Sequence, residues 1–225
     1  MDWEFVFRDR GEQAANAEWS RCGLDHVRLE GDISPLLNID APRVAIVGSR
    51  NPSPCGKMAL INVLHALSCS GGEEKPIVIS GLALGTDICA HSLAMDKGLP
   101  TFAVLPNGLD HVYPSAHTGF AKRMTETPGC GLLTQFPDNI APESVNFIDQ
   151  KRTIALMSDI VIVICAEAKS SSVLTARFAK EFGVPVYAFP GEVGDPRSAG
   201  CNQLIHNGIA EIIPNVDYLS EIFDF

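Results

Sequence analysis

Three short segments of the sequence are rich in small and hydroxyl-bearing residues, and one of them adds a basic residue; these are residue types that bind phosphate. They are Gly48-Ser49-Arg50, the run SGLALG at 80–85 and the run SSSVLT at 170–175. Glycine lets a ligand approach the backbone, and the amides at a helix start supply donors and partial positive charge. We therefore predict phosphate-binding loops; the alternative is ordinary glycine turns, helix caps and a solvated arginine. The candidate residues are Gly48, Ser49, Arg50, Ser80, Gly81, Gly85, Ser170, Ser171, Ser172 and Thr175.

A fourth segment, FIDQKR at 147–152, places two cations near an aromatic side chain. The candidate residues are Phe147, Lys151 and Arg152. This combination suits a site where phosphate contacts accompany base stacking. A solvated helix face with a core phenylalanine has the same spacing, so both interpretations stay open.

Asp87 and His91 lie one helical turn apart and form a conceivable catalytic pair. We favour a structural interpretation, in which Asp87 caps a helix and His91 is hydrogen-bonded and partly buried. No Ser or Cys is placed by motif to be activated by the histidine, so we do not expect an enzyme.

Short apolar runs that end at Gly, Ser or Pro alternate along the chain with helical segments. The expected strands are 44–47, 77–79, 101–104, 132–134, 160–164, 184–188 and 210–213. The expected helices are 57–68, 87–97, 118–126, 150–157, 173–182, 202–206 and 216–222. This alternation predicts a Rossmann-like α/β fold with a mostly parallel sheet and helices on both faces. Ligands bind such sheets at the carboxyl ends of the strands, where the three phosphate-type segments are expected.

The chain divides into a short extension and one domain. Residues 1–42 mix charges, two Trp and Pro without sustained periodicity, and we expect an irregular N-terminal extension. Residues 43–225 are expected to form the Rossmann-like domain, because 225 residues leave little room for a second one.

Composition limits the classes of partner. A formal net charge of −10 opposes non-specific nucleic-acid binding, so a DNA site must be a local basic patch. The seven cysteines show no C-x-x-C pair and no zinc-ligand spacing with histidine. We expect reduced, mostly buried thiols, no metal and no cofactor. No apolar run is long enough to span a bilayer and no leader pattern is evident, so we expect a cytoplasmic protein without a membrane partner.

The segments described above, together with three more, resemble the DprA/Smf (DNA-processing protein A) family. The matching motifs are VAIVGSR (44–50), SGLALGTDICAH (80–91), VLPNGLDHVYP (104–114), the basic segment ending at residue 155, SSSVLTA (170–176), AFPG (188–191) and GCNQLIHNG (200–208). The resemblance implies a core that binds single-stranded DNA without sequence preference and helps to load a RecA-type recombinase during DNA uptake or recombination. It also implies self-association, so a homodimer is expected, and a minimal member without the flanking domains of many relatives.

The chain departs from the family pattern at three positions. Gln150-Lys151-Arg152 stands where the family commonly has Arg-Asn-Arg, Cys165 replaces a Glu, and Ser171 replaces the Gly of a Ser-Gly-Ser loop. Two other functions remain as alternatives: a sensor of small nucleotides and a LOG-like nucleotide phosphoribohydrolase. The second would show a Pro-Gly-Gly-x-Gly-Thr loop and a catalytic Glu, where this chain has SSSVLTA.

Overall fold

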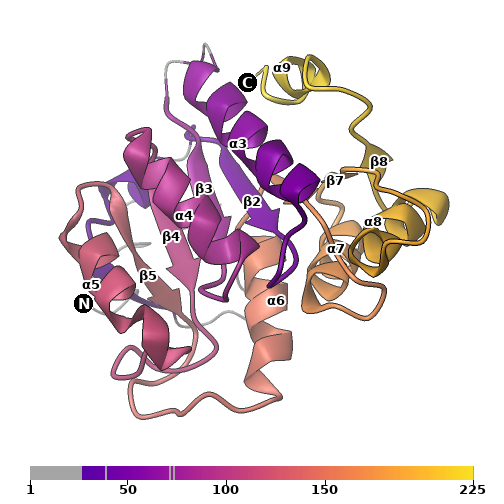
Figure 1. The fold of residues 1–225 in the computed structure, drawn as a ribbon. Helices are drawn as coiled ribbons and strands as arrows, with labels where there is room; N and C mark the ends of the chain where they lie inside the picture. Colours follow the sequence, from indigo (N-terminus) through magenta and orange to yellow (C-terminus); the bar gives the residue numbers. More distant parts are fainter. Residues whose placement is uncertain (1–26, 39, 71, 73, 225) are drawn as a thin grey trace.

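Buried runs of aliphatic residues form the strands at the centre of the molecule, as the computed structural model shows (Figure 1). The structure describes residues 27–38, 40–70, 72 and 74–224. The strands in this part of the chain are β1 (Arg28–Gly31), β2 (Arg43–Val47), β3 (Ile77–Ser80), β4 (Thr101–Val104), β5 (Cys130–Thr134), β6 (Ile160–Val163), β7 (Val186–Ala188) and β8 (Glu211–Ile212). The helices are α3 (Pro54–Cys69), α4 (Thr86–Asp96), α5 (Thr118–Glu126), α6 (Asn146–Leu156), α7 (Ser171–Glu181), α8 (Pro196–His206) and α9 (Tyr218–Ile222), with short 3-10 turns at Ser34–Leu37 and Ser115–His117.

The strands form one sheet in the order β1-β5-β4-β3-β2-β6-β7-β8. Every neighbouring pair is parallel except β1 with β5, which is antiparallel. From β2 the chain adds strands outward on one side and, from β6, outward on the other. Such a reversal of strand order opens a crevice at the carboxyl ends of the two central strands.

Alternate residues of the strands face the two layers of helices. One layer packs α3, α4 and α9 against side chains such as Val44 and Ile46 of β2. The other layer packs α6, α7 and α8 against Ala45 and Val47 of the same strand. Figure 1 shows α3 and α4 crossing the near face of the sheet. The predicted fold class is therefore confirmed. No helix of the described part of the chain is both long and apolar enough to cross a membrane.

The element boundaries differ from the predicted ones mainly at helix starts. Helix α8 begins at Pro196, earlier than expected, because the Asp195 carboxylate caps it by accepting a hydrogen bond from the Arg197 amide at 2.9 Å. Strand β1 falls in the range 1–42, where we expected no regular element. It was missed because RLEG carries a single buried aliphatic side chain, and its pairing to β5 is set by long-range contact. Residues 1–26 of the expected extension lie outside the described residues.

The loop after β2 lies against the first turn of α4. The Thr86 amide donates to Ser49 O at 3.1 Å, and the Thr86 hydroxyl donates to the same oxygen at 3.0 Å. Gly85 permits this contact, because a Cβ there would lie 2.4 Å from Arg50 O, and its φ of +80° is disfavoured for other residues. The loop that carries Arg50 is thus positioned by the backbone of α4.

The structure corrects the cap predicted at Asp87 and bears out the hydrogen-bonded, buried position predicted for His91. The N-cap residue of α4 is Gly85, and the Asp87 carboxylate accepts a long hydrogen bond, 3.4 Å, from the Ala83 amide, with the Ser80 side chain as a further partner. His91 is fully buried, with Nε2 2.7 Å from Gly81 O and Nδ1 2.7 Å from the Thr101 hydroxyl. Because a carbonyl only accepts, neutral His91 carries its proton on Nε2, and the single hydroxyl hydrogen of Thr101 has two possible acceptors, His91 Nδ1 and Val78 O at 2.9 Å.

Burial of His91 makes the stability of the fold depend on pH. Desolvation lowers the pKa of His91 from 6.5 to about 4. The unfolded chain therefore binds this proton at a higher pH than the folded chain, and stability falls as the pH drops through that window. We expect this residue to contribute a loss of roughly 3 kcal/mol in the free energy of unfolding between the two pKa values.

The measurement is urea unfolding of wild type and His91→Gln at several pH values across that window. The variant should show a shallower dependence on pH, whereas the matched change at exposed His65, His65→Gln, should keep the wild-type slope. Equal slopes for wild type and His91→Gln would refute this account of the buried imidazole.

The contact at Gly85 predicts a stability difference between two glycine substitutions. Gly183 has φ +77° with nothing within 4 Å of a Cβ, so Gly183→Ala should lose only the backbone preference, roughly 1 kcal/mol. Gly85→Ala meets the same strain and also the Arg50 and Ser49 carbonyls, so it should destabilise more. Thermal unfolding of both variants tests this; equal losses would mean that the loop yields freely.

Candidate functional site

A cavity of about 160 Å³ opens at the carboxyl ends of the central strands, where the predicted phosphate segments come together. The loops after β2, β3 and β4, the start of α6 and the first residue of α7 form its wall. The lining residues are Arg50, Leu82, Ala83, Leu84, Pro106, Tyr113, Pro114, Phe147, Gln150, Lys151 and Ser171. We call it the Arg50–Lys151 cavity, after its two cationic residues.

The two cations reach the cavity from different elements. Arg50 is exposed on the loop after β2, whereas Lys151 on α6 is only 6% exposed. Lys151 Nζ donates to Gln150 Oε1 at 2.9 Å, and Gln150 Nε2 donates to Val104 O, at the end of β4, at 2.6 Å. The ammonium group is therefore held in place by the sheet. A buried, oriented cation interacts more strongly with an anion than a solvated one.

Asp87 and Lys151 lie close to each other, next to Gly81. A Cβ placed on Gly81 would be 2.6 Å from Asp87 Oδ2 and 3.6 Å from Lys151 Nζ, so both groups approach the same glycine. Burial lowers the pKa of Lys151, the Asp87 carboxylate opposes that shift, and Arg50 adds to it. Burial likewise raises the pKa of Asp87, and the Lys151 and Arg50 charges oppose the rise. Gly81 is needed because a Cβ there would clash with the Asp87 carboxylate.

Two aromatic rings stand at the mouth of the cavity. The rings of Tyr113 and Phe147 are 5.4 Å apart and nearly perpendicular, at 78°. Tyr113 is 42% exposed, so its ring offers a surface to a planar ligand. Phe147 was predicted from the sequence, but Tyr113 was missed, although it lies in the motif at 104–114. The signal that could have found it is that Tyr113 is the one Phe, Tyr or Trp in that motif.

Three of the predicted hydroxyls bond to backbone oxygens and do not line the cavity. Ser172 Oγ donates to Gly48 O at 2.8 Å and so ties α7 to the loop after β2. Ser80 Oγ donates to Ile46 O at 2.6 Å, and Thr175 Oγ1 donates to Ser171 O at 3.3 Å. Ser170 is the N-cap residue of α7, but its side chain makes no capping hydrogen bond.

The structure therefore separates the predicted residues into two groups. Four of them line the Arg50–Lys151 cavity: Arg50, Phe147, Lys151 and Ser171. Gly48, Ser49, Gly81 and Gly85 shape the loops around it, as described above. Arg152 lies elsewhere, with its guanidinium 5.2 Å from the centre of the Phe178 ring on α7, and a DNA-binding role for it remains a prediction.

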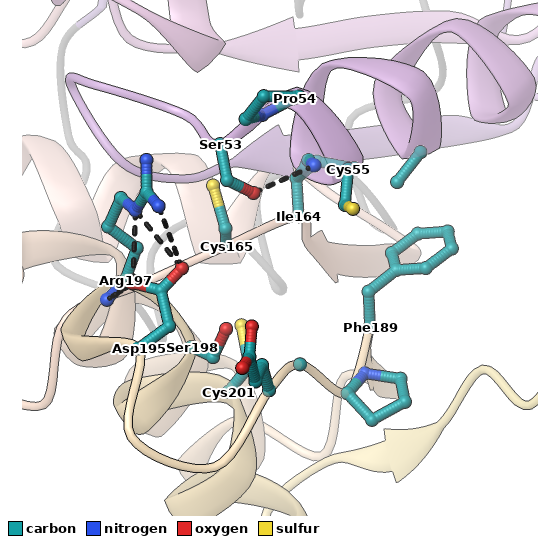
Figure 2. Close-up of a pocket in the computed structure, with 15 residues that line it drawn as sticks. Ser53, Pro54, Cys55, Ile164, Cys165, Phe189, Asp195, Arg197, Ser198 and Cys201 are labelled. Carbon is teal, nitrogen blue, oxygen red and sulfur yellow. Dashed lines mark hydrogen bonds and ion pairs between the residues drawn. The ribbon is translucent and has the colours of Figure 1, made fainter.

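A larger cavity of about 650 Å³ lies between the starts of α3 and α8, at the ends of β6 and β7 (Figure 2). Arg197 is the one Lys or Arg among the described residues that line it, and Figure 2 shows its guanidinium bonded to Asp195, at 2.9 Å. Glu192 adds another acidic group to the lining. The positive charge is thus compensated, and this second cavity is a poorer phosphate site.

Three thiols line this second cavity, those of Cys55, Cys165 and Cys201. Burial raises the pKa of Cys201 to about 12, which keeps it an unreactive thiol. The six described cysteines are all free, as expected, but half of them are exposed, so the expectation of mostly buried thiols was too strong. No three His, Cys, Asp or Glu side chains in the described residues are grouped as metal ligands.

Comparison with known proteins links this arrangement to one family. Residues 28–224 match the family "DNA recombination-mediator protein A". Protein Smf of Synechocystis sp. is 36% identical over 191 residues, covering 84% of this chain and 44% of that protein. DprA of Streptococcus pneumoniae is 36% identical over 186 residues, covering 82% of this chain and 62% of that protein. The chain thus spans about half the length of these curated relatives.

Two solved structures share the fold closely. The crystal structure of DprA from S. pneumoniae superposes with a TM-score of 0.78 at 31% identity, covering 89% of this chain and 67% of that one. DNA processing protein A from Helicobacter pylori, whose structure was determined for its single-stranded DNA binding mode, gives a TM-score of 0.76 at 29% identity, covering 88% and 86%. The match extends over nearly all of the described residues, and the chain belongs to the DNA recombination-mediator protein A family, which includes DprA and Smf.

Proposed function

We propose that this chain binds the backbone of single-stranded DNA in the Arg50–Lys151 cavity and acts as a recombination mediator. The observation that carries the proposal is the convergence of two cations from separate elements on a cavity edged by Tyr113 and Phe147. Arginine binds phosphate through a planar fork, and a held ammonium adds a point charge. Support also comes from membership in a family of recombination mediators and from the H. pylori relative that binds single-stranded DNA.

The aromatic pair favours single strands over duplex. In a duplex both faces of each base are already stacked, whereas a single strand leaves bases that can stack on an exposed ring. Stacking is tolerant of sequence because every base presents a π-face. A cavity with one exposed aromatic edge and two cations therefore fits a strand of any sequence.

The acidic total charge confines binding to this site. A net charge of −10 disfavours approach of DNA over most of the surface, so few phosphates are neutralised at once. We infer a shallow salt dependence, with a contribution of about one unit from each cationic contact. Binding that depends on one cavity suits a protein that positions DNA for a partner. Three further properties remain predictions from the family resemblance: the loading of a RecA-type recombinase, a homodimeric state and a cytoplasmic location.

The first test removes the exposed cation. Arg50→Ala should weaken binding of a fluorescent oligothymidylate and lower the slope of log affinity against log salt by roughly one. Anisotropy titrations at several salt concentrations measure both quantities. Lys57→Ala is the matched control, because Lys57 is exposed on α3 and does not line the cavity. An Arg50→Ala protein that keeps the wild-type affinity and slope would remove this cavity as the DNA site.

A second test concerns the ring that sequence analysis missed. Tyr113→Ala should lose roughly 1–3 kcal/mol of binding free energy to single strands, because a base loses its stacking surface. Tyr113→Phe keeps the ring and should retain nearly all of the affinity, which separates stacking from a contact by the hydroxyl. Equal losses in the two variants, measured by the same anisotropy assay, would contradict stacking at this position.

A further inference from the structure

A third charged group, the Asp87 carboxylate, lies near the two cations of the Arg50–Lys151 cavity. Asp87 is 5% exposed, and a Cβ placed on Gly81 would lie 2.6 Å from Asp87 Oδ2 and 3.6 Å from Lys151 Nζ, so the carboxylate and the ammonium are close together. If one proton is shared by Asp87 and Lys151, the pair is neutral in total whichever group holds it. With the Arg50 guanidinium, these three groups present a net charge of about one positive unit to a ligand.

This net charge matches one kind of phosphate better than the other. An internal phosphodiester carries one negative charge, whereas a terminal phosphate carries about −1.5 to −2 near neutral pH. Two cations without Asp87 would match the doubly charged group. With Asp87 present, a second ligand charge would stay uncompensated next to buried groups, and such a charge is strongly disfavoured.

A purely structural account of Asp87 is weak. The N-cap position of α4 belongs to Gly85, and the hydrogen bond that Asp87 accepts from Ala83 N is long, at 3.4 Å. Burying a carboxylate carries a large desolvation penalty, and the largest opposing contribution comes from the Lys151 charge, ahead of the hydrogen bonds with Ala83 and Ser80. The group that it does approach is Lys151, and Lys151 lines the cavity.

Resting on the DNA-binding function proposed above, we propose that Asp87 makes the Arg50–Lys151 cavity selective for internal phosphodiesters over terminal phosphates. Asp87 is a positioning residue in this proposal: it compensates the charge of Lys151 and repels a second negative charge on the bound phosphate. The selection favours the interior of a strand over strand ends and over mononucleotides. The cavity thereby discriminates single-stranded DNA from mononucleotides, which contain the same base and sugar but carry a terminal phosphate.

Two probes that differ in one methyl group test the proposal. Thymidine 5′-methylphosphate is a diester with one charge, and thymidine 5′-monophosphate is doubly charged at about pH 8. Chemical-shift titration of the isotopically labelled full chain gives a dissociation constant for each compound. Wild type should bind the methyl ester more tightly. In Asp87→Asn the preference for the methyl ester over the monoester should fall roughly tenfold, because one repulsive charge is gone.

A second variant keeps the test decisive if Asp87→Asn fails to fold. Ser171 is exposed and lines the cavity at the first residue of α7, a position that tolerates aspartate. Ser171→Asp adds a negative charge there and should move the ratio further toward the methyl ester. Equal affinities for the two compounds in wild type, or an unchanged ratio in folded Asp87→Asn, would overturn the proposal.

The outcomes also separate this proposal from the function on which it rests. Oligothymidylate binding, measured in the same buffer, reports on DNA binding as such. If the protein binds the oligonucleotide but binds the two thymidine compounds equally well, charge selection alone is overturned. Discrimination without oligonucleotide binding supports charge selection and overturns the DNA-binding function. If neither compound shifts residues of the cavity, both proposals fail.

Discussion

Close backbone contact between the loop after β2 and the first turn of α4 is the constraint on which the rest of the site depends. Gly85 makes the contact possible, and the two hydrogen bonds from Thr86 to Ser49 O hold it. Ser172 secures the same loop from the other side by donating to Gly48 O. Arg50 therefore directly follows two residues, Gly48 and Ser49, whose backbone oxygens accept hydrogen bonds from α7 and α4. A flexible loop would pay ordering entropy each time it bound an anion.

The second cation is positioned by burial. Lys151 is held by Gln150, and Gln150 is held by a carbonyl at the end of β4, so the order of the sheet fixes where the ammonium lies. An exposed lysine in an acidic protein would attract phosphate weakly, since water screens it and its side chain must be ordered. Burial strengthens the interaction and also makes a nearby counter-charge necessary. Asp87, which lies next to Gly81, supplies that charge.

The fold was largely predictable because parallel strands with both faces covered leave uninterrupted aliphatic runs. The runs at β2, β3, β4 and β6 have this form, and their order along the chain gave the architecture. Strand β1 was not predictable, because its residues carry little apolar signal and its place is decided by pairing with β5. Long-range pairing of this kind is invisible to local propensity.

The site was predicted in part for a similar reason. Position after a strand identified Arg50, since residues that follow strands gather at one edge of the sheet. The pairing of basic residues with an aromatic residue identified Lys151 and Phe147. The direction of each side chain depends on packing, however, so sequence could not show that Lys151 is buried and Arg152 lies over Phe178. Nor could it show that three of the predicted hydroxyls, those of Ser80, Ser172 and Thr175, bond to backbone oxygens. Tyr113 reaches the cavity through a loop whose path no periodic pattern describes.

The most direct measurement of the central claim is a crystal structure of this protein with a short oligothymidylate bound. The account predicts a backbone phosphate between the Arg50 guanidinium and the Lys151 ammonium, with an adjacent base against the Tyr113 ring. A strand bound instead in the larger cavity between the starts of α3 and α8, with Arg50 and Lys151 untouched, would contradict it.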